Sequence, residues 1–286
     1  MLQNRATLKQ IRFHLLSELR QIYTENESDS MVRLILEHLG YPLTLSIRDP
    51  DHVPEPPVND KIKEIMTDIH KGFPIQYVLG QTHFCELLIK VDRRVLIPRP
   101  ETEVMVEHIK SSTRDPIHRI MDLGTGSGCI ALALKQYFPE AEVWGVDKSR
   151  DALSLARENG RINKLQVNWG EMDLLDHHTM DQKTPFNLVV SNPPYVMKKE
   201  GKLMAPHVKD FEPGSALFVE DDDALVFYRA IASFCSMHLA EKGDIWVEIN
   251  EQFGKETARL FENEGFRNTL IRKDIHEKER YIHARR

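Results

Sequence analysis

A polar tetrapeptide, Asn192-Pro193-Pro194-Tyr195, directly follows the apolar residues 186–191. The side-chain oxygen of Asn192 and the backbone carbonyl of Pro193 can each accept one N–H of a planar amino group. Two such acceptors orient the nitrogen and stabilise the positive charge that develops on it during group transfer. Consecutive prolines hold the backbone rigidly and offer no competing N–H, and Tyr195 can supply a flat wall. The four residues therefore predict a catalytic and substrate-binding site for a planar –NH2 group, with a simple Asn-Pro turn as the alternative.

A glycine-rich segment lies upstream, where one strand is predicted to end and a helix to begin. Glycines at such a point allow a tight turn and let a ligand lie against the backbone, and ligands of open α/β sheets bind at this edge. Asp147 ends the next predicted strand, 23 residues after Gly124, where its carboxylate can accept both hydroxyls of a ribose. The residues expected to bind a nucleoside-containing cofactor are Gly124, Thr125, Gly126, Ser127, Gly128 and Asp147.

The spacing of the glycines helps to decide which cofactor is bound. A dinucleotide fingerprint, G-x-G-x-x-G, seats pyrophosphate on the helix N-terminus and would require glycine where this chain has Cys129. The observed G-x-G-x-G suits a ligand without phosphates, and S-adenosylmethionine carries an amino-acid tail and a sulfonium instead. Glu171 can accept the adenine amino group and Met172 can pack on the ring, although a plain polar loop explains them equally well. Asn192 is also expected to face the cofactor.

The elements that carry these residues alternate between strand and helix from residue 117 onward. Apolar periodicity predicts strands at 118–123, 141–147, 164–168, 186–191, 244–249, 267–272 and 279–284, with helices at 127–137, 149–160, 223–239 and 251–264. Repeated strand–helix units indicate a mainly parallel sheet with helices on both faces. No helix separates the final two strands, so the last strand should insert antiparallel. The predicted fold class is α/β, with a Rossmann-like sheet of the kind that binds S-adenosylmethionine.

The first part of the chain has a different pattern. Amphipathic helices are predicted at 5–24, 29–40 and 59–71, and five prolines predict a loop at 42–57. Residues 82–97 should form a hairpin that turns at Asp92-Arg93-Arg94, followed by a helix at 101–111. The predicted organisation is a small helical N-terminal domain at 1–80, a hairpin and linker helix at 81–116, and a catalytic domain at 117–286.

The composition limits the class of protein. Hydrophobic residues make up 41% and charged residues 29% of the chain, an ordinary soluble balance. No apolar run approaches the roughly 20 residues of a membrane span, and a net charge of −6 argues against stable binding of nucleic acid. Three scattered cysteines without Cys-x-x-Cys spacing favour the reducing cytoplasm and predict no metal site.

Segments outside the glycine turn and the tetrapeptide narrow the acceptor. The chain closely resembles the PrmC/HemK release-factor glutamine methyltransferases at residues 72–80, Phe84, residues 95–103, Glu212-Pro213, Ala216-Leu217, Tyr228-Arg229 and Glu248-Ile249. This resemblance implies methyl transfer from S-adenosylmethionine to the side-chain amide nitrogen of a glutamine in protein. It further implies that the glutamine is that of the Gly-Gly-Gln motif of peptide chain release factors, and that the N-terminal domain helps to hold the factor.

Some positions depart from the pattern of this family, and other functions share the tetrapeptide. An acidic run at 220–223 replaces a glycine-rich turn, Asn250 replaces a glycine, Met172 replaces an aromatic residue, and the C-terminal pattern differs around 274–280. A nucleic-acid adenine amino-methyltransferase is one alternative, but it would need basic and aromatic surfaces to hold a base. A ribosomal-protein glutamine methyltransferase is the other, but such enzymes typically differ at residues 99–102.

Overall fold

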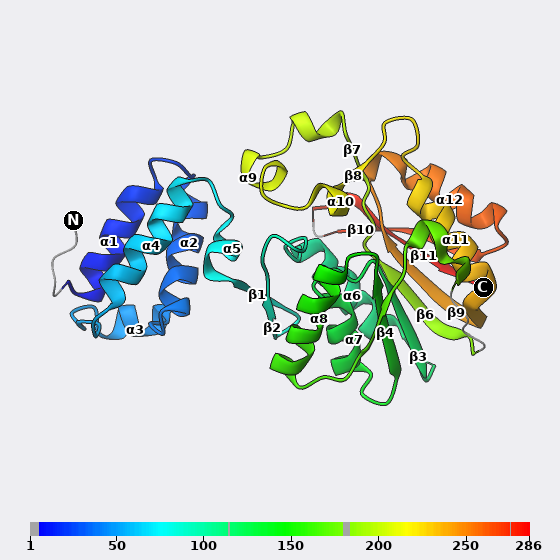
Figure 1. Cartoon of the computed structure of the whole chain (residues 1–286), viewed down its shortest axis with the longest axis horizontal. Helices are drawn as coiled ribbons and strands as arrows, with labels where there is room; N and C mark the ends of the chain where they lie inside the picture. The colour runs from blue at the N-terminus through cyan, green and yellow to red at the C-terminus, as the bar shows by residue number, and fades with distance from the viewer. Residues whose placement is uncertain (1–5, 114, 180–183, 275) are drawn as a thin grey trace. The chain divides into compact units, whose positions relative to one another are not determined.

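Two separate hydrophobic cores divide the chain into two units, Met1–Leu79 and Gly80–Arg286. The computed structural model, drawn in Figure 1, describes residues 6–113, 115–179, 184–274 and 276–286. None of the described helices combines the length and the apolar character that a membrane-spanning helix needs.

In the described part of the first unit, residues 6–79, the regular secondary structure is helical. Its helices are α1 (Leu8–Leu19), α2 (Glu25–His38), α3 (Leu43–Arg48), α4 (Val58–His70) and α5 (Ile75–Leu79). Each of the first two helices begins with a capping box. The side chains of Thr7 and Thr24 accept from the backbone N–H groups of Gln10 and Glu27, whose side chains accept from the backbone N–H groups of the two threonines. The predicted loop at 42–57 is wrong in part: α3 forms between Pro42 and Pro50, since the prolines flank that stretch without interrupting it.

The second unit contains a seven-stranded sheet in the order β10-β11-β9-β6-β3-β4-β5. The strands are β3 (Arg119–Leu123), β4 (Glu142–Asp147), β5 (Asn168–Glu171), β6 (Phe186–Ser191), β9 (Leu239–Glu248), β10 (Arg267–Lys273) and β11 (Glu279–Arg285). From β5 to β9 every neighbouring pair is parallel, whereas β11 is antiparallel to both β9 and β10. The prediction of a mainly parallel sheet with an inserted antiparallel last strand is therefore confirmed.

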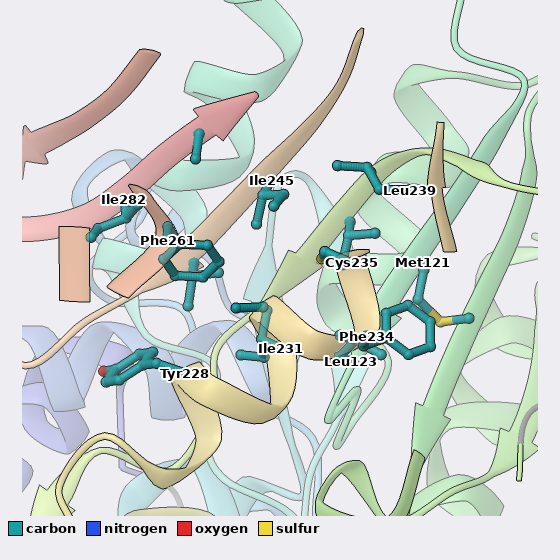
Figure 2. Packing of buried hydrophobic residues seen from close by; sticks show 14 of the residues in the cluster. Met121, Leu123, Tyr228, Ile231, Phe234, Cys235, Leu239, Ile245, Phe261 and Ile282 are labelled. Atoms are coloured by element: carbon teal, nitrogen blue, oxygen red, sulfur yellow. The ribbon is translucent and has the colours of Figure 1, made fainter. Parts of the chain in front are cut away.

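Helices cover both faces of this sheet (Figure 1). On one side α6 (Pro100–Ser112), α7 (Cys129–Tyr137) and α8 (Arg150–Asn163) pack in sequence, and on the other α11 (Val226–His238) packs against α12 (Gly254–Asn263) and the short helix η1 (Leu174–Thr179). Figure 2 shows how α11 inserts Ile231, Phe234 and Cys235 among strand residues such as Leu123 and Ile245. All five are essentially inaccessible to water, so apolar burial fixes the strands that carry the polar edge.

The first strands of this unit turn at a different point from the one predicted. Strands β1 (Gln81–Phe84) and β2 (Leu87–Lys90) pair antiparallel through a two-residue turn at Cys85-Glu86, so the expected turn at residues 92–94 is wrong. Cys85 and Glu86 both have positive φ, 47° and 66°. Such a turn matches the twist of a hairpin, but it usually contains glycine or asparagine, and this one has neither.

The third strand of the parallel sheet is also displaced from its prediction at 164–168. Helix α8 continues to Asn163 and ends at Lys164, which adopts a left-handed conformation with φ of 57°. The chain therefore enters β5 only at Asn168. Two short strands, β7 (Val196–Met197) and β8 (Phe218–Val219), pair outside the main sheet. The short helices η2 (Glu200–Lys202), α9 (Pro206–Lys209) and α10 (Gly214–Leu217) lie between them in sequence.

The indole ring of Trp169, on β5, packs beneath the glycine-rich turn. A Cβ atom at Gly128 would lie 2.7 Å from the ring, and one at Gly145 on β4 would lie 2.5 Å from it and 2.8 Å from Oγ1 of Thr125. Neither distance leaves room for a methyl group. The ring of Trp169 can therefore pack between the turn and the sheet only because residues 128 and 145 are glycines.

Replacing Gly145 by alanine should therefore destabilise the second unit. The added methyl must displace Trp169 or Thr125, and overpacking of this kind costs about 1–3 kcal/mol, which lowers the melting temperature by several degrees. Gly170→Ala on β5 is the matched control, because its Cβ would meet its nearest neighbour, in Val146, at an ordinary 3.4 Å. Equal melting temperatures for the two variants would contradict the proposed contact.

Candidate active site

The parallel strands bring the predicted site segments to one edge of the sheet. Leu123, the last residue of β3, is in register with Val146 on β4 and with Ser191 on β6, and Asp147 is in register with Glu171 on β5. The glycine turn, the β4 terminus and the tetrapeptide therefore begin side by side. This follows from parallel pairing, because the carboxyl ends of parallel strands meet at the same edge.

The glycine turn is held to β4 by its own backbone. The N–H groups of Gly124 and Thr125 both donate to the carbonyl of Val146 at 2.9 Å, and that of Gly126 donates to Oδ2 of Asp147 at 2.9 Å. Gly124 and Gly126 have φ of 72° and 54°, values that other residues rarely adopt. The second carboxylate oxygen, Oδ1, accepts from the N–H of Ser149. Asp147 is thus fixed in orientation, and each of its oxygens retains a lone pair for a ligand hydroxyl.

A cavity of about 420 Å³ opens along this edge. Of the predicted site residues, its lining includes Gly124, Thr125, Gly126, Ser127, Asp147, Met172, Asn192, Pro193 and Pro194. Gly128, Glu171 and Tyr195 are not part of the lining. Gly128 instead caps α7, and the carboxylate of Glu171 accepts from Nε of Arg150 at 2.6 Å. Asp173, two residues further along, does line the cavity beside Met172.

A segment between β2 and α6 forms another wall that the sequence did not suggest. It contributes Arg93, Arg94, Val95, Leu96, Pro98 and Arg99 to the lining, and Thr102 in the first turn of α6 lines the cavity beside it. The buried carboxylate of Glu212 fixes this segment, because its oxygens accept from Nη2 of Arg99 at 2.7 Å and from the N–H of Ile97 at 3.1 Å. In this ion pair the side chain of Glu212 is fully buried, with 0% exposure, whereas that of Arg99 is 30% exposed.

A buried hydrogen-bonded chain lies behind the tetrapeptide. Nδ2 of Asn192 donates to Oγ1 of Thr102 at 2.9 Å, and Oγ1 of Thr102 donates to Oε2 of Glu248 at 2.6 Å. The Tyr195 hydroxyl donates to Oε1 of Glu248 at 2.8 Å. Tyr195 therefore directs its hydroxyl to the buried carboxyl group and is not a wall of the cavity. Burial raises the pKa of both Glu248 and Tyr195, and for Tyr195 the nearby Glu248 adds to the rise.

The departures at Asn250 and at the acidic run 220–223 lie around the segment that follows Tyr195. Nδ2 of Asn250 donates to the carbonyl of Tyr195 at 3.2 Å and to Oε2 of Glu200 at 3.0 Å. In the acidic run, Oδ1 of Asp221 accepts from the N–H of Lys199 at 2.9 Å, and Glu220 forms an ion pair with Lys198. Both departures therefore attach the segment after the tetrapeptide to the rest of the unit.

Asp122, at the start of the glycine-rich segment, is fully buried. Its Oδ2 accepts from Oγ1 of Thr125 at 2.5 Å and from the N–H of Ala131 at 3.2 Å, and its Oδ1 has no hydrogen-bond partner among the described residues. Burial, with a smaller contribution from the charge of Asp147, raises the pKa of Asp122 to about 7. The native protein therefore binds this proton more tightly than the unfolded chain does.

Stability should consequently fall as pH rises through the interval between the two pKa values, from 3.8 in the unfolded chain to about 7 in the native protein. Asp122→Asn cannot ionise and should lack this dependence. We expect the melting temperature of the cofactor-free variant, relative to wild type, to increase between pH 5 and pH 8, since each pKa unit corresponds to about 1.4 kcal/mol. A difference that stays constant over that range would show that the raised pKa of Asp122 is absent.

Comparison with known proteins agrees with this geometry. Residues 100–209 match the family model described as methyltransferase small domain. The release factor glutamine methyltransferase of Flavobacterium psychrophilum is 37% identical over 286 residues, covering 96% of this chain and 98% of that protein. The release factor glutamine methyltransferase of Bacteroides thetaiotaomicron is 35% identical over 280 residues, covering 98% of this chain and 100% of that protein.

Solved structures share the fold at low identity. A methyltransferase from Pyrococcus furiosus has a TM-score of 0.50 and 15% identity, covering 69% of this chain and 87% of that chain. A 16S rRNA methyltransferase from T. thermophilus, in complex with AdoMet and guanosine, has a TM-score of 0.50 and 16% identity, covering 72% of this chain and 49% of that chain. The predicted Rossmann-like fold and S-adenosylmethionine dependence are confirmed, and the chain belongs to the release factor glutamine methyltransferase family.

Proposed function

We propose that this chain methylates the side-chain amide nitrogen of the glutamine in the Gly-Gly-Gln motif of peptide chain release factors, and that Asn192 and Pro193 hold that amide. The observation that carries the proposal is the orientation of Asn192. Because Nδ2 of Asn192 donates inward to Thr102, its Oδ1 remains to accept a hydrogen bond, and Asn192 lines the same cavity as the glycine turn. The names of the similar proteins support a release factor as the substrate.

The residues of the cavity fit S-adenosylmethionine. Gly124 and Gly126 leave open space where other residues would place a Cβ, and Asp147 offers two oriented oxygens to the ribose hydroxyls. Met172 is buried with 7% exposure beside the cavity and offers an apolar surface to the adenine ring. When bound, this cofactor supplies a methyl group on a positively charged sulfur, which a nitrogen lone pair can attack.

The chain's own contribution at the acceptor side is orientation and charge stabilisation. An amide nitrogen is a weak nucleophile because its lone pair is delocalised into the carbonyl. Oδ1 of Asn192 and the carbonyl of Pro193 can each accept one of its N–H groups, which aligns the lone pair and favours the partly positive nitrogen of the transition state. The prolines at 193 and 194 line the cavity and donate no competing N–H. No strong base is required, because the nitrogen can release its proton to water after it has gained the methyl group.

Two substitutions should separate the cofactor function from the acceptor function. Asp147→Ala removes two charge-assisted hydrogen bonds and should weaken cofactor binding at least about tenfold. Asn192→Ala should leave that affinity within about threefold but lower kcat roughly a hundred- to a thousandfold, which is typical of losing one preorganised transition-state hydrogen bond. Calorimetry with S-adenosylhomocysteine and mass spectrometry of the methylated release factor measure the two effects.

Each variant is the control for the other. Near-normal turnover of a release factor by Asn192→Ala would contradict the proposed mechanism, and unchanged cofactor affinity in Asp147→Ala would contradict the cofactor site. Wild-type protein is assayed in parallel on adenine in DNA and RNA and on ribosomal proteins. Methylation of one of these, with none of a release factor, would keep the mechanism and reassign the substrate.

We further propose that the unit Met1–Leu79 recognises the release factor. Every described residue that lines the cavity belongs to the other unit, which leaves the first unit without an assigned role at the cofactor site. Among its exposed large apolar side chains, Phe13 at 75% and Ile47 at 69% are the most exposed, and a protein partner would cover side chains of this kind. We also propose that the protein acts in the cytoplasm, where translation takes place and where the free thiols of Cys85, Cys129 and Cys235 would stay reduced.

Phe13→Ser tests this assignment. Loss of an interface side chain that contributes about 1 kcal/mol should raise the KM for an intact release factor about fivefold. The KM for a short Gly-Gly-Gln peptide should not change, because such a peptide needs only the cavity, whose lining residues all belong to the second unit. If the KM values for the peptide and the intact factor changed equally, or if neither changed, Phe13 would have no role in recognising the release factor.

A further inference from the structure

The chain Asn192–Thr102–Glu248–Tyr195 joins elements that are distant in sequence. Thr102 lies in the first turn of α6, Glu248 is the last residue of β9, and Asn192 follows β6. Strands β6 and β9 are parallel neighbours, with Ser191 in register with Val247, so Asn192 and Glu248 leave the sheet side by side. Thr102 and Glu248 are 2% and 1% exposed, and the tetrapeptide bonds to them through the amide of Asn192 and the hydroxyl of Tyr195.

Each hydrogen bond between Asn192, Thr102, Glu248 and Tyr195 has a defined donor and acceptor. A threonine hydroxyl carries one proton, and that of Thr102 is given to Glu248. Its oxygen can therefore only accept from Asn192, so the amide of Asn192 must present its NH2 group to Thr102. The two carboxyl oxygens of Glu248 accept hydrogen bonds, Oε2 from the hydroxyl of Thr102 and Oε1 from that of Tyr195.

We propose that Thr102 and Glu248 are positioning residues that hold the side-chain amide of Asn192 in one orientation, with Oδ1 toward the acceptor nitrogen. This inference rests on the proposed function. If the amide of Asn192 turned over, its oxygen would face the oxygen of Thr102, whose only proton is engaged, and the hydrogen bond would become a repulsion. The turned amide would also present N–H groups to the N–H groups of the substrate. The buried carboxyl group thus selects the one orientation in which Asn192 can accept.

Matched threonine substitutions test the inference. Thr102→Val keeps the shape of the side chain but removes the acceptor for Asn192, and we expect kcat on a release factor to fall about tenfold or more, with cofactor affinity unchanged. Thr102→Ser keeps the hydroxyl and should restore kcat to within about threefold of wild type. Thr257→Val, on α12, makes the same change at a fully buried threonine whose Oγ1 has no partner among the described residues, and should leave kcat unchanged.

A double-mutant cycle separates positioning from a general structural effect. If Thr102 acts through Asn192, adding Thr102→Val to Asn192→Ala should lower kcat no further, whereas independent effects would multiply. Glu248→Gln provides a second variant, because its NH2 group cannot accept from a hydroxyl. It should lower kcat with cofactor affinity retained, and it decides the question by the same readouts if Thr102→Val melts below the assay temperature.

The outcomes distinguish this inference from the function on which it rests. A wild-type protein that methylates no release factor would refute the proposed function. A wild-type enzyme that is active, together with Thr102→Val of normal kcat, would refute the positioning role alone. Equal losses in Thr102→Val and Thr102→Ser, or losses that multiply with Asn192→Ala, would likewise overturn it, because packing and not the hydroxyl would then be responsible.

Discussion

A buried carboxyl group requires hydrogen-bond donors, because burying an acidic group without them costs on the order of several kcal/mol. Glu248 obtains its donors from two segments of the acceptor site, the hydroxyl of Thr102 on α6 and that of Tyr195 after β6. Asn192 is attached to the same group through Thr102. Asn192, the side chain expected to contact the substrate, is therefore oriented by Thr102, whose hydroxyl donates to the buried carboxyl group of Glu248.

The same constraint recurs on other walls of the cavity. Glu212 holds Arg99 and the backbone of Ile97, which keeps the segment before α6 against the cavity. Asp122 holds Thr125 in the glycine turn and the first turn of α7. Glu212 and Glu248 each accept from residues distant in sequence, and Asp122 joins the glycine turn to the helix that follows it. An apolar residue of similar volume could accept none of these hydrogen bonds. The cavity keeps its shape because three buried acids accept hydrogen bonds from the segments that enclose it.

The sequence predicted the parts of the site that are runs of neighbouring residues. The glycine turn and the tetrapeptide each follow a strand, and parallel strands bring such points together without further information. Thr102, Glu212 and Glu248 were not assigned roles from their own chemistry, because their hydrogen bonds join residues up to 146 positions apart and no local pattern encodes such a contact. The misplaced hairpin turn has a different cause: Cys85-Glu86 takes a left-handed conformation without glycine or asparagine, so composition carried no signal.

The two halves of the site are held by separate sets of contacts. On the cofactor side, the turn is bound to β4 chiefly through backbone N–H groups that donate to Val146 and to Asp147. On the acceptor side, Glu248 holds the tetrapeptide from behind, while Asn250, where the family favours glycine, binds the carbonyl of Tyr195 from β9's end. A glycine at position 250 would have no side chain to donate this hydrogen bond. The side chain of Asn250 therefore restrains the backbone at Tyr195. The hydrogen bonds described for the two sets share no residue, so a change on the acceptor side can alter the orientation of the acceptor without altering the contacts to the cofactor.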